Sequence, residues 1–197
     1  MAKKVKNTEY LMLSSMIRAR EAGMLSRERM DRMISAPNFQ EAAKLLTDCG
    51  YEDMSNCDAA GVNAALNRRR AEVFAELANM VPQGEVVDIF RAKYDYHNLK
   101  ALVKARALGL DCAGILSDCG RVPPEKLSEY TSEEGTLSSL PEDMAEAYTE
   151  AAATLARTGN PQLADFELDA RYFAVIGKMA AATGSKFLTG YVQTLID

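Results

Sequence analysis

Closely spaced helix start and stop signals constrain this chain more than any other feature of its sequence. Apolar residues recur three and four positions apart, which places them on one face of a helix. Residues that favour helix starts precede these runs, and glycine or proline follows them. We expect helix caps at Thr8, Ser26, Asn38 and Ser185. Because Ala, Leu, Met, Glu and Arg recur while β-branched runs are few, the sequence predicts an all-α fold.

The chain changes character between Leu110 and Leu140, where Gly, Pro and Ser interrupt the apolar runs. This segment has room only for one short helix, near 125–130. We therefore predict three parts: a first helical unit at 1–112, a connector at 113–140 and a second helical unit at 141–197.

An internal repeat relates residues 66–95 to residues 168–197, which align without gaps at an offset of 102 residues. Two helices and the break between them match together. The paired residues include Leu66 with Leu168, Val73 with Val175, Phe90 with Val192, and Asp95 with Asp197. In the first copy a further helical run follows Asp95, whereas the second copy stops at Asp197. The sequence therefore predicts duplicated multi-helix units, the second one truncated, and such units commonly stack into scaffolds.

The charge balance narrows the partners that we expect. The net charge of −5 and the pI near 5.1 argue against a nucleic-acid partner, which would need a concentrated positive field. No apolar run approaches the ~20 residues that a spanning helix needs. The acidic balance is compatible with a cytoplasmic protein, and such a protein could sit on a membrane complex through contacts with other proteins.

Residues that could carry chemistry are few. The four cysteines, Cys49, Cys57, Cys112 and Cys119, form no C-x-x-C pair and lie far in sequence from the lone His97, so we predict reduced thiols and no metal site. There is no phosphate-binding loop, and no nucleophile stands beside a plausible base. We predict no catalytic residue, no cofactor and no bound nucleotide.

The cluster at 94–98 is the one place where a catalytic function could be argued. A helical enzyme using Asp95 and His97 is therefore a competing hypothesis. We favour a structural role, in which a break falls near Asp95 and Asp95 and Asn98 cap the helix that follows. The recurrence of this aspartate as Asp197 favours structure, since a catalytic residue need not recur in each unit.

Methionines are frequent in the first two predicted helices. We expect them to belong to the core, with a partner-facing methionine surface as the alternative, since Met adapts to irregular surfaces. The residues concerned are Met12, Met16, Met24, Met30 and Met33.

Two stretches resemble the C subunit of the A/V-type ATPases, a family related to the d subunit of the eukaryotic V-ATPase. The first is similar to a recurring F-x-x-x-Y-D-x-x-N-L-K pattern, which Phe90, Tyr94, Asp95, Asn98, Leu99 and Lys100 fill. The second is the stretch from Leu168 to Asp197, which resembles the same family. The N-terminal YLMLSSMIRAREAGMLS also looks like the opening of this family. Together with Asp197, the residues of the first stretch form a structural signature.

The resemblance implies a non-catalytic member of the central stalk in a rotary V-type ATPase or ATP synthase. Such a protein links the rotor axle to the membrane rotor ring, so it couples torque to proton or sodium transport. The implied partners are the membrane rotor ring subunits and the central axle subunits. An unrelated helical-repeat interaction scaffold is the alternative, since it would share the composition and the repeat.

Overall fold

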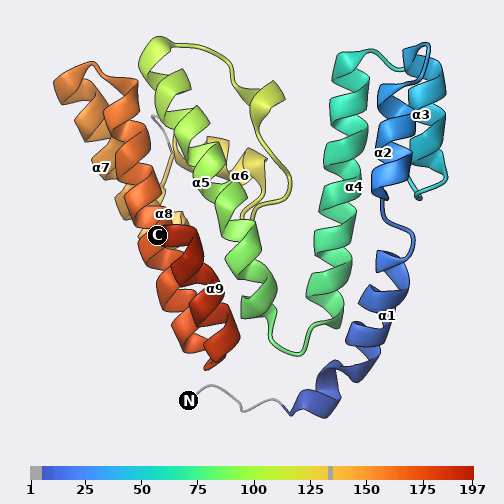
Figure 1. The fold of residues 1–197 in the computed structure, drawn as a ribbon. Helices are drawn as coiled ribbons and strands as arrows, with labels where there is room; N and C mark the ends of the chain where they lie inside the picture. The colour runs from blue at the N-terminus through green and yellow to red at the C-terminus, as the bar shows by residue number, and fades with distance from the viewer. Residues whose placement is uncertain (1–5, 133–134) are drawn as a thin grey trace. The chain divides into compact units, whose positions relative to one another are not determined.

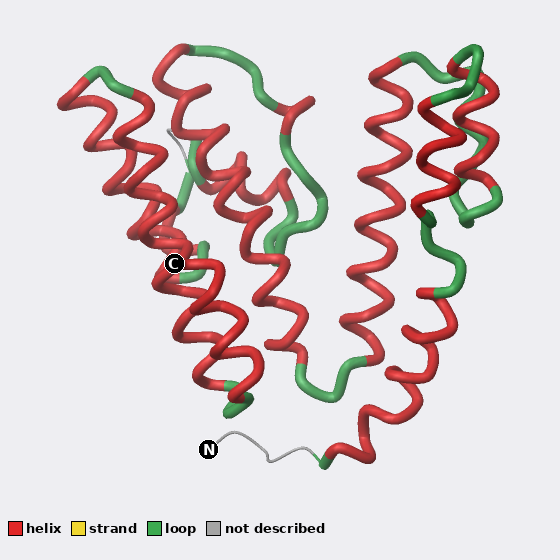
Figure 2. The backbone as a smooth tube through the Cα atoms, viewed as in Figure 1, coloured by secondary structure: helices red, strands yellow, loops and turns green. Residues whose placement is uncertain are grey.

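The computed structural model describes residues 6–132 and 135–197, and in these ranges the chain is built from helices with no strand (Figures 1 and 2). The all-α prediction is confirmed. The elements are η1 (Asn7–Tyr10), α1 (Leu11–Glu21), α2 (Arg27–Ile34), α3 (Phe39–Thr47), α4 (Ala59–Met80), α5 (Gly84–Leu108), η2 (Ala113–Ile115), α6 (Pro124–Tyr130), η3 (Leu137–Ser139), α7 (Glu142–Thr158), α8 (Pro161–Ala182) and α9 (Lys186–Ile196).

Most of the predicted caps are confirmed. The side chains of Ser26, Asn38 and Ser185 accept hydrogen bonds from backbone N–H groups in the first turns of α2, α3 and α9. Thr8 is not a cap, because it lies inside η1, which runs directly into α1. Gly109 closes α5 in the left-handed conformation, at φ 63°, which a residue with a side chain rarely adopts.

By its contacts the chain divides between Pro82 and Gln83. This boundary differs from the ends predicted for the three sequence segments. It lies before α5 because α5 packs with α7 and α8. The helices α5 to α9 therefore belong to one compact unit, and α1 to α4 belong to the other. As a division into repeat units, the segments 1–112, 113–140 and 141–197 stay a prediction.

The unit formed by residues 83–197 has a substantial apolar core. In it α7 and α8 run side by side, and α5 and α9 pack against α8 (Figure 1). The largest cluster of buried residues joins α5 and α6 to α7 and α8: Tyr96, Leu99, Leu102, Val103, Leu127, Leu140, Met144, Ala147, Tyr148, Ala151, Ala164 and Leu168. A second cluster, Ile89, Ala92, Ile176, Ala180, Leu188 and Val192, joins α5 to α8 and α9. The buried connection between α5 and α8 is what positions the site described below.

The unit formed by residues 6–82 buries much less. Its core cluster consists of Ala43, Met54 and Ala65 with half-buried neighbours around them. Ion pairs link Arg20 of α1 and Arg68 of α4 to Glu76 and Glu52, respectively.

The prediction that the methionines of the first two predicted helices are core residues is wrong for Met12 in α1, Met30 in α2 and Met24, which lies between these helices. These side chains are 76%, 67% and 47% exposed. Met16 and Met33 are half-buried. The reason is that the unit has so small a core that one face of each short helix is enough to cover it.

The helices keep the register of the internal repeat. The bounds of α8 lie 102 residues after those of α4, and α9 begins 102 residues after the start of α5. Both α4 and α8 begin with a side-chain cap of the same type, Asp58 and Asn160. These coincidences support the predicted duplication, which itself stays a prediction.

Candidate functional site: a helix that clamps the connector

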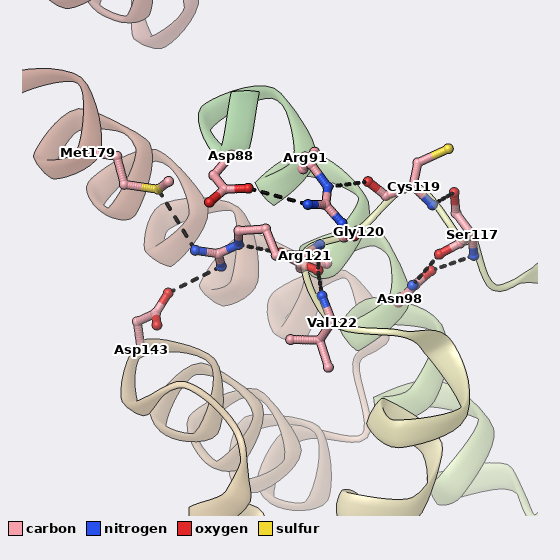
Figure 3. A network of polar contacts seen from close by, with 11 residues as sticks. Asp88, Arg91, Asn98, Ser117, Cys119, Gly120, Arg121, Val122, Asp143 and Met179 are labelled. Atoms are coloured by element: carbon pink, nitrogen blue, oxygen red, sulfur yellow. Dashed lines mark hydrogen bonds and ion pairs between the residues drawn. The ribbon is translucent and has the colours of Figure 1, made fainter. Parts of the chain in front are cut away.

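Three polar residues on one face of α5 hold the connector that follows this helix. Arg91, Asp95 and Asn98 are spaced four and three positions apart, so they project from the same side. The connector residues that they hold, 117–122, lie along this face (Figure 3).

Asn98 binds the connector through a reciprocal pair of hydrogen bonds. Its amide nitrogen donates to the carbonyl oxygen of Ser117 at 2.9 Å, and the backbone N–H of Ser117 donates to its amide oxygen at 2.8 Å. Asn98 is 0% exposed and Ser117 is buried, so water cannot reach them. Without this pairing, the amide of Asn98 and the backbone of Ser117 would have no hydrogen-bond partner. Two turns earlier on α5, Arg91 donates to the carbonyl oxygens of Cys119 and Gly120.

Asp95 is the centre of the clamp. Its carboxylate accepts from the backbone N–H of Arg121 at 2.8 Å, from the backbone N–H of Val122 at 3.2 Å and from the Arg121 guanidinium at 2.6 Å. The guanidinium also lies 3.6 Å from the carboxylate of Asp143 on α7 (Figure 3). Asp95 therefore ties together α5, the connector and, through Arg121, the start of α7.

Burial dominates the electrostatics of Asp95, which is 0% exposed. Removal from water raises the pKa of Asp95 above its ordinary value, although Arg121 and the two backbone N–H groups act to lower it. Burial likewise raises the pKa of the neighbouring Tyr96 hydroxyl. The arrangement is a buried charge with an opposite charge beside it, so loss of Arg121 leaves Asp95 without a counter-charge, and loss of Asp95 leaves Arg121 with only the more distant Asp143.

Gly120 lets the connector approach α5 closely enough for this binding. A Cβ atom at position 120 would lie 2.4 Å from Oδ1 of Asp95 and 3.3 Å from the carbonyl oxygen of Val122. A side chain at this position would therefore push the connector away from the carboxylate that it binds.

The prediction that a break falls near Asp95 is wrong, and so is the prediction that Asp95 and Asn98 cap a helix. Helix α5 runs without interruption from Gly84 to Leu108. Asp and Asn disfavour helix interiors because their side chains compete for nearby backbone groups. Here both side chains form hydrogen bonds with backbone groups of the connector. They therefore do not compete for the backbone of α5, and the helix continues through both positions without a break.

The other signature residues have separate surroundings. Leu99 is buried in the core, and Tyr94 is half-buried. Lys100 forms an ion pair with Asp169 of α8, at 2.6 Å. Phe90 is 40% exposed, and its ring lies 5.8 Å from that of Tyr191. Apart from Asp197, the signature residues thus share α5, and of these only Asp95 and Asn98 belong to the clamp.

Asp197, the last signature residue, lies at the end of α9. It is exposed, and its carboxylate accepts a hydrogen bond from the amide of Gln193 at 2.8 Å. The structure does not bring it together with Asp95.

His97 does not form a catalytic pair with Asp95. It lies on a different face of α5, and its Nε2 atom lies 3.1 Å from the carbonyl oxygen of Ile115. The Asp95 carboxylate is enclosed and bound to Arg121, so no substrate atom could reach it. This geometry does not support the hypothesis of a helical enzyme that uses this pair.

Sequence reasoning did not find the connector residues of the clamp. Arg121, Ser117 and Gly120 lie in a segment without periodicity, more than one helical turn from any predicted motif. The available signal was on α5, where the spacing of Arg91, Asp95 and Asn98 places three polar side chains on one face of the helix. Such residues require partners, but nothing in their spacing says where the partners lie.

The fold and the clamp together define an all-helical protein whose most elaborate polar cluster holds helices and a connector in place. Comparison with known proteins gives the family. The model of the ATP synthase (C/AC39) subunit family matches residues 13–197, so the chain belongs to this family.

Two curated relatives agree with this assignment. The chain is 28% identical to the C subunit of the A-type ATP synthase of Methanocaldococcus jannaschii over 131 residues, which are 61% of this chain and 33% of that protein. It is 30% identical to the C subunit of the V-type sodium ATPase of Enterococcus hirae over 105 residues, which are 51% of this chain and 31% of that protein. The matched stretches therefore span about a third of the length of each relative. No solved structure matches the chain significantly.

Proposed function

We propose that this chain is part of a non-catalytic central-stalk subunit of a rotary V-type ATPase or ATP synthase. In this role it links the rotor axle to the membrane rotor ring, so that torque is coupled to ion transport. The observation that carries the proposal is the family match over residues 13–197. The relatives are named as the C subunits of an ATP synthase and of a sodium ATPase, which makes ion transport the process that they serve.

The clamp supports a mechanical rather than a chemical role. The best-formed polar cluster of the chain is enclosed, and its partners are backbone groups and an arginine of the same chain. A buried network of paired polar groups of this kind fixes how neighbouring elements are placed. A protein that transmits torque needs such fixed connections between its helices.

The proposed location is the cytoplasmic face of the membrane, where the protein is attached through its partners. Among the described residues, no helix is long and apolar enough to cross a membrane. In the proposed role, attachment comes from contacts with the ring subunits.

A co-purification experiment tests the proposal. The tagged chain is mixed separately with the detergent-solubilised rotor ring and with the axle subunits from the same source. We expect it to be retained with both and to hydrolyse no ATP by itself. Failure to bind either partner would contradict the stalk assignment, and ATP hydrolysis by the purified chain would contradict the non-catalytic one.

A further inference from the structure

A groove of about 1050 Å³ lies within the unit 83–197, between the last turns of α5, the connector and α6. It adjoins the clamp, because Asp118 of the clamped connector lines it, but Arg91, Asp95 and Asn98 do not line it. Its volume is at the upper end of what small-molecule sites occupy, which leaves room for several side chains of a partner.

The groove has an apolar floor. This floor includes Leu102, Ala105, Leu116 and Pro124, which come from α5, the connector and α6. At the rim, Leu110 is 64% exposed. An apolar floor with an uncovered leucine beside it can accept the apolar side chains of a partner.

The walls of the groove are acidic. Asp111, Asp118, Glu125 and Glu129 line it and are exposed, and Arg106 is the basic residue among the lining side chains. In the part of the chain that the structure describes, none of these four carboxylates is in an ion pair. The guanidinium of Arg106 donates to the carbonyl oxygen of Ser128 at 2.9 Å. The C-terminal end of α5 opens on the same groove and adds the partial negative charge of a helix terminus.

This charge pattern selects the kind of occupant. An anionic ligand such as a nucleotide would be repelled by the walls. The carboxylates are also too dispersed for a cation site, since the described residues contain no group of three or more acidic, histidine or cysteine side chains that could hold a metal ion. Dispersed carboxylates above an apolar floor complement a peptide segment that has cationic side chains on one face and apolar side chains on the other.

The geometry points to this groove as the docking site for a cationic amphipathic helix of a partner protein. Lysine or arginine side chains of the partner pair with Asp118, Glu125 and Glu129, while its apolar side chains cover Leu110 and the floor. Asp111 contributes less, because its carboxylate accepts from the backbone N–H of Ala113 at 2.9 Å. As a statement about the ATPase complex this inference rests on the proposed function, but the binding of such a helix does not.

Fluorescence anisotropy with two synthetic helical peptides tests the inference. One peptide contains only leucine and lysine, and the other contains only leucine and glutamate in the same pattern. The wild-type chain should bind the lysine peptide and not the glutamate peptide. No binding of the lysine peptide, or equal binding of both, would overturn the inference.

Two triple variants separate the groove from the net charge. The groove variant carries Asp118→Asn, Glu125→Gln and Glu129→Gln, and the control variant carries Asp48→Asn, Glu85→Gln and Glu142→Gln, which are exposed acidic residues outside the groove. Three lost surface charge pairs should weaken binding of the lysine peptide roughly tenfold in the groove variant. The control should stay within about threefold of wild type, because it changes only the overall charge. Equal weakening in both variants, or wild-type affinity of the groove variant, would overturn the inference.

A third variant, Leu110→Ser, tests the apolar part without changing the charge. Because Leu110 is 64% exposed, the fold should tolerate this change. Binding of the lysine peptide should fall several-fold through lost apolar contact, and unchanged binding would overturn the assignment of Leu110 to the interface. If the groove variant no longer binds the lysine peptide but still binds the rotor ring and the axle subunits, the result supports the groove as a docking site. It does not decide the stalk role. Loss of ring and axle binding by the wild type would count against the proposed function alone.

Discussion

Asp95 and Asp197 occupy matching positions of the predicted internal repeat, but their surroundings have little in common. Asp95 is fully buried and binds two backbone N–H groups and a guanidinium of the connector. Asp197 is exposed and accepts one hydrogen bond from Gln193, a residue of its own helix. An aspartate at the same place in the helical pattern is thus buried and hydrogen-bonded to another segment in one copy, and exposed on the surface in the other.

The helices that precede these aspartates differ in the same direction. Leu168, Ile176 and Ala180 of α8 are 0% exposed, whereas their counterparts in α4, Leu66, Phe74 and Ala78, are half-buried. The reason lies in the neighbours, because α8 is packed against α5, α7 and α9. A shared apolar stripe therefore predicts which face of a helix is covered, but the number of packed neighbours decides how much stability the stripe contributes.

The largest expected difference between the two copies is at the aspartates. Asp95→Ala should lower the free energy of unfolding by about 3–5 kcal/mol, because it leaves Arg121 buried beside the more distant Asp143 alone. Asp197→Ala should change it by no more than about 0.5 kcal/mol. Urea denaturation of both variants measures the difference. Similar effects in the two variants would show that the clamp does not carry the stability that its burial implies.

The leucine pair sharpens the comparison between α4 and α8. Leu168→Ala should reduce the free energy of unfolding by about 2–5 kcal/mol, since it opens a cavity in a closed core. Leu66→Ala should reduce it by roughly half as much, because its site is partly open to water. Thermal and urea unfolding of the two variants decide this. An equal loss would mean that the α4 stripe is covered as completely as the α8 stripe.

A glycine pair tests how closely the connector must approach α5. Gly120→Ala should lower the free energy of unfolding by about 1–3 kcal/mol, because its Cβ atom would lie 2.4 Å from Oδ1 of Asp95. Gly177→Ala in α8 is the matched control, since the added Cβ atom would meet nothing within 4 Å beyond its chain neighbours and the backbone of its own helix, and the helix interior favours alanine. The control should be more stable than wild type by roughly 0.5–1 kcal/mol. If Gly120→Ala were as stable as wild type, the close approach would not be needed.

The smallest expected effect is the pH dependence of the Asp95 contribution. Its folded pKa is raised above the ordinary 3.8, so the folded protein holds this proton more tightly than the unfolded chain. The contribution to stability is therefore fully present below pH 3.8 and declines as the pH rises through the folded pKa. Asp95→Asn lacks this titration, so the advantage of wild type over the variant should shrink as the pH rises from about 4 to about 7. Urea unfolding across that range measures it, and an advantage that grows with pH would show that Arg121 lowers the pKa more than burial raises it.

Several features could be predicted from local sequence because their causes are local. The caps at Ser26, Asn38 and Ser185 bind backbone groups only three residues away, and Gly109 closes α5 within its own last turn. The repeat likewise predicted which helices would match in position. These features need no information about distant parts of the chain.

The function of a given polar residue could not be predicted in this way. The partners of Asp95 lie 26 and 27 residues further along the chain, in a segment without periodicity. From the sequence, an aspartate in that position favours a helix end, because its carboxylate would otherwise compete with the helix backbone. In the structure, the connector instead donates hydrogen bonds to the carboxylate of Asp95. The carboxylate therefore does not compete with the helix backbone, and α5 continues without a break.

The sequence by itself determined the helical class, the helix starts at Ser26, Asn38 and Ser185 and the family resemblance, since each depends on residues within a few turns of one another. Only the tertiary structure decided which copy of the repeat is buried, which signature residues clamp the connector and where an acidic groove opens. The physical reason is that burial and charge compensation depend on which elements pack together. Two stretches with the same pattern can therefore have different surroundings, and the surroundings set what each residue does.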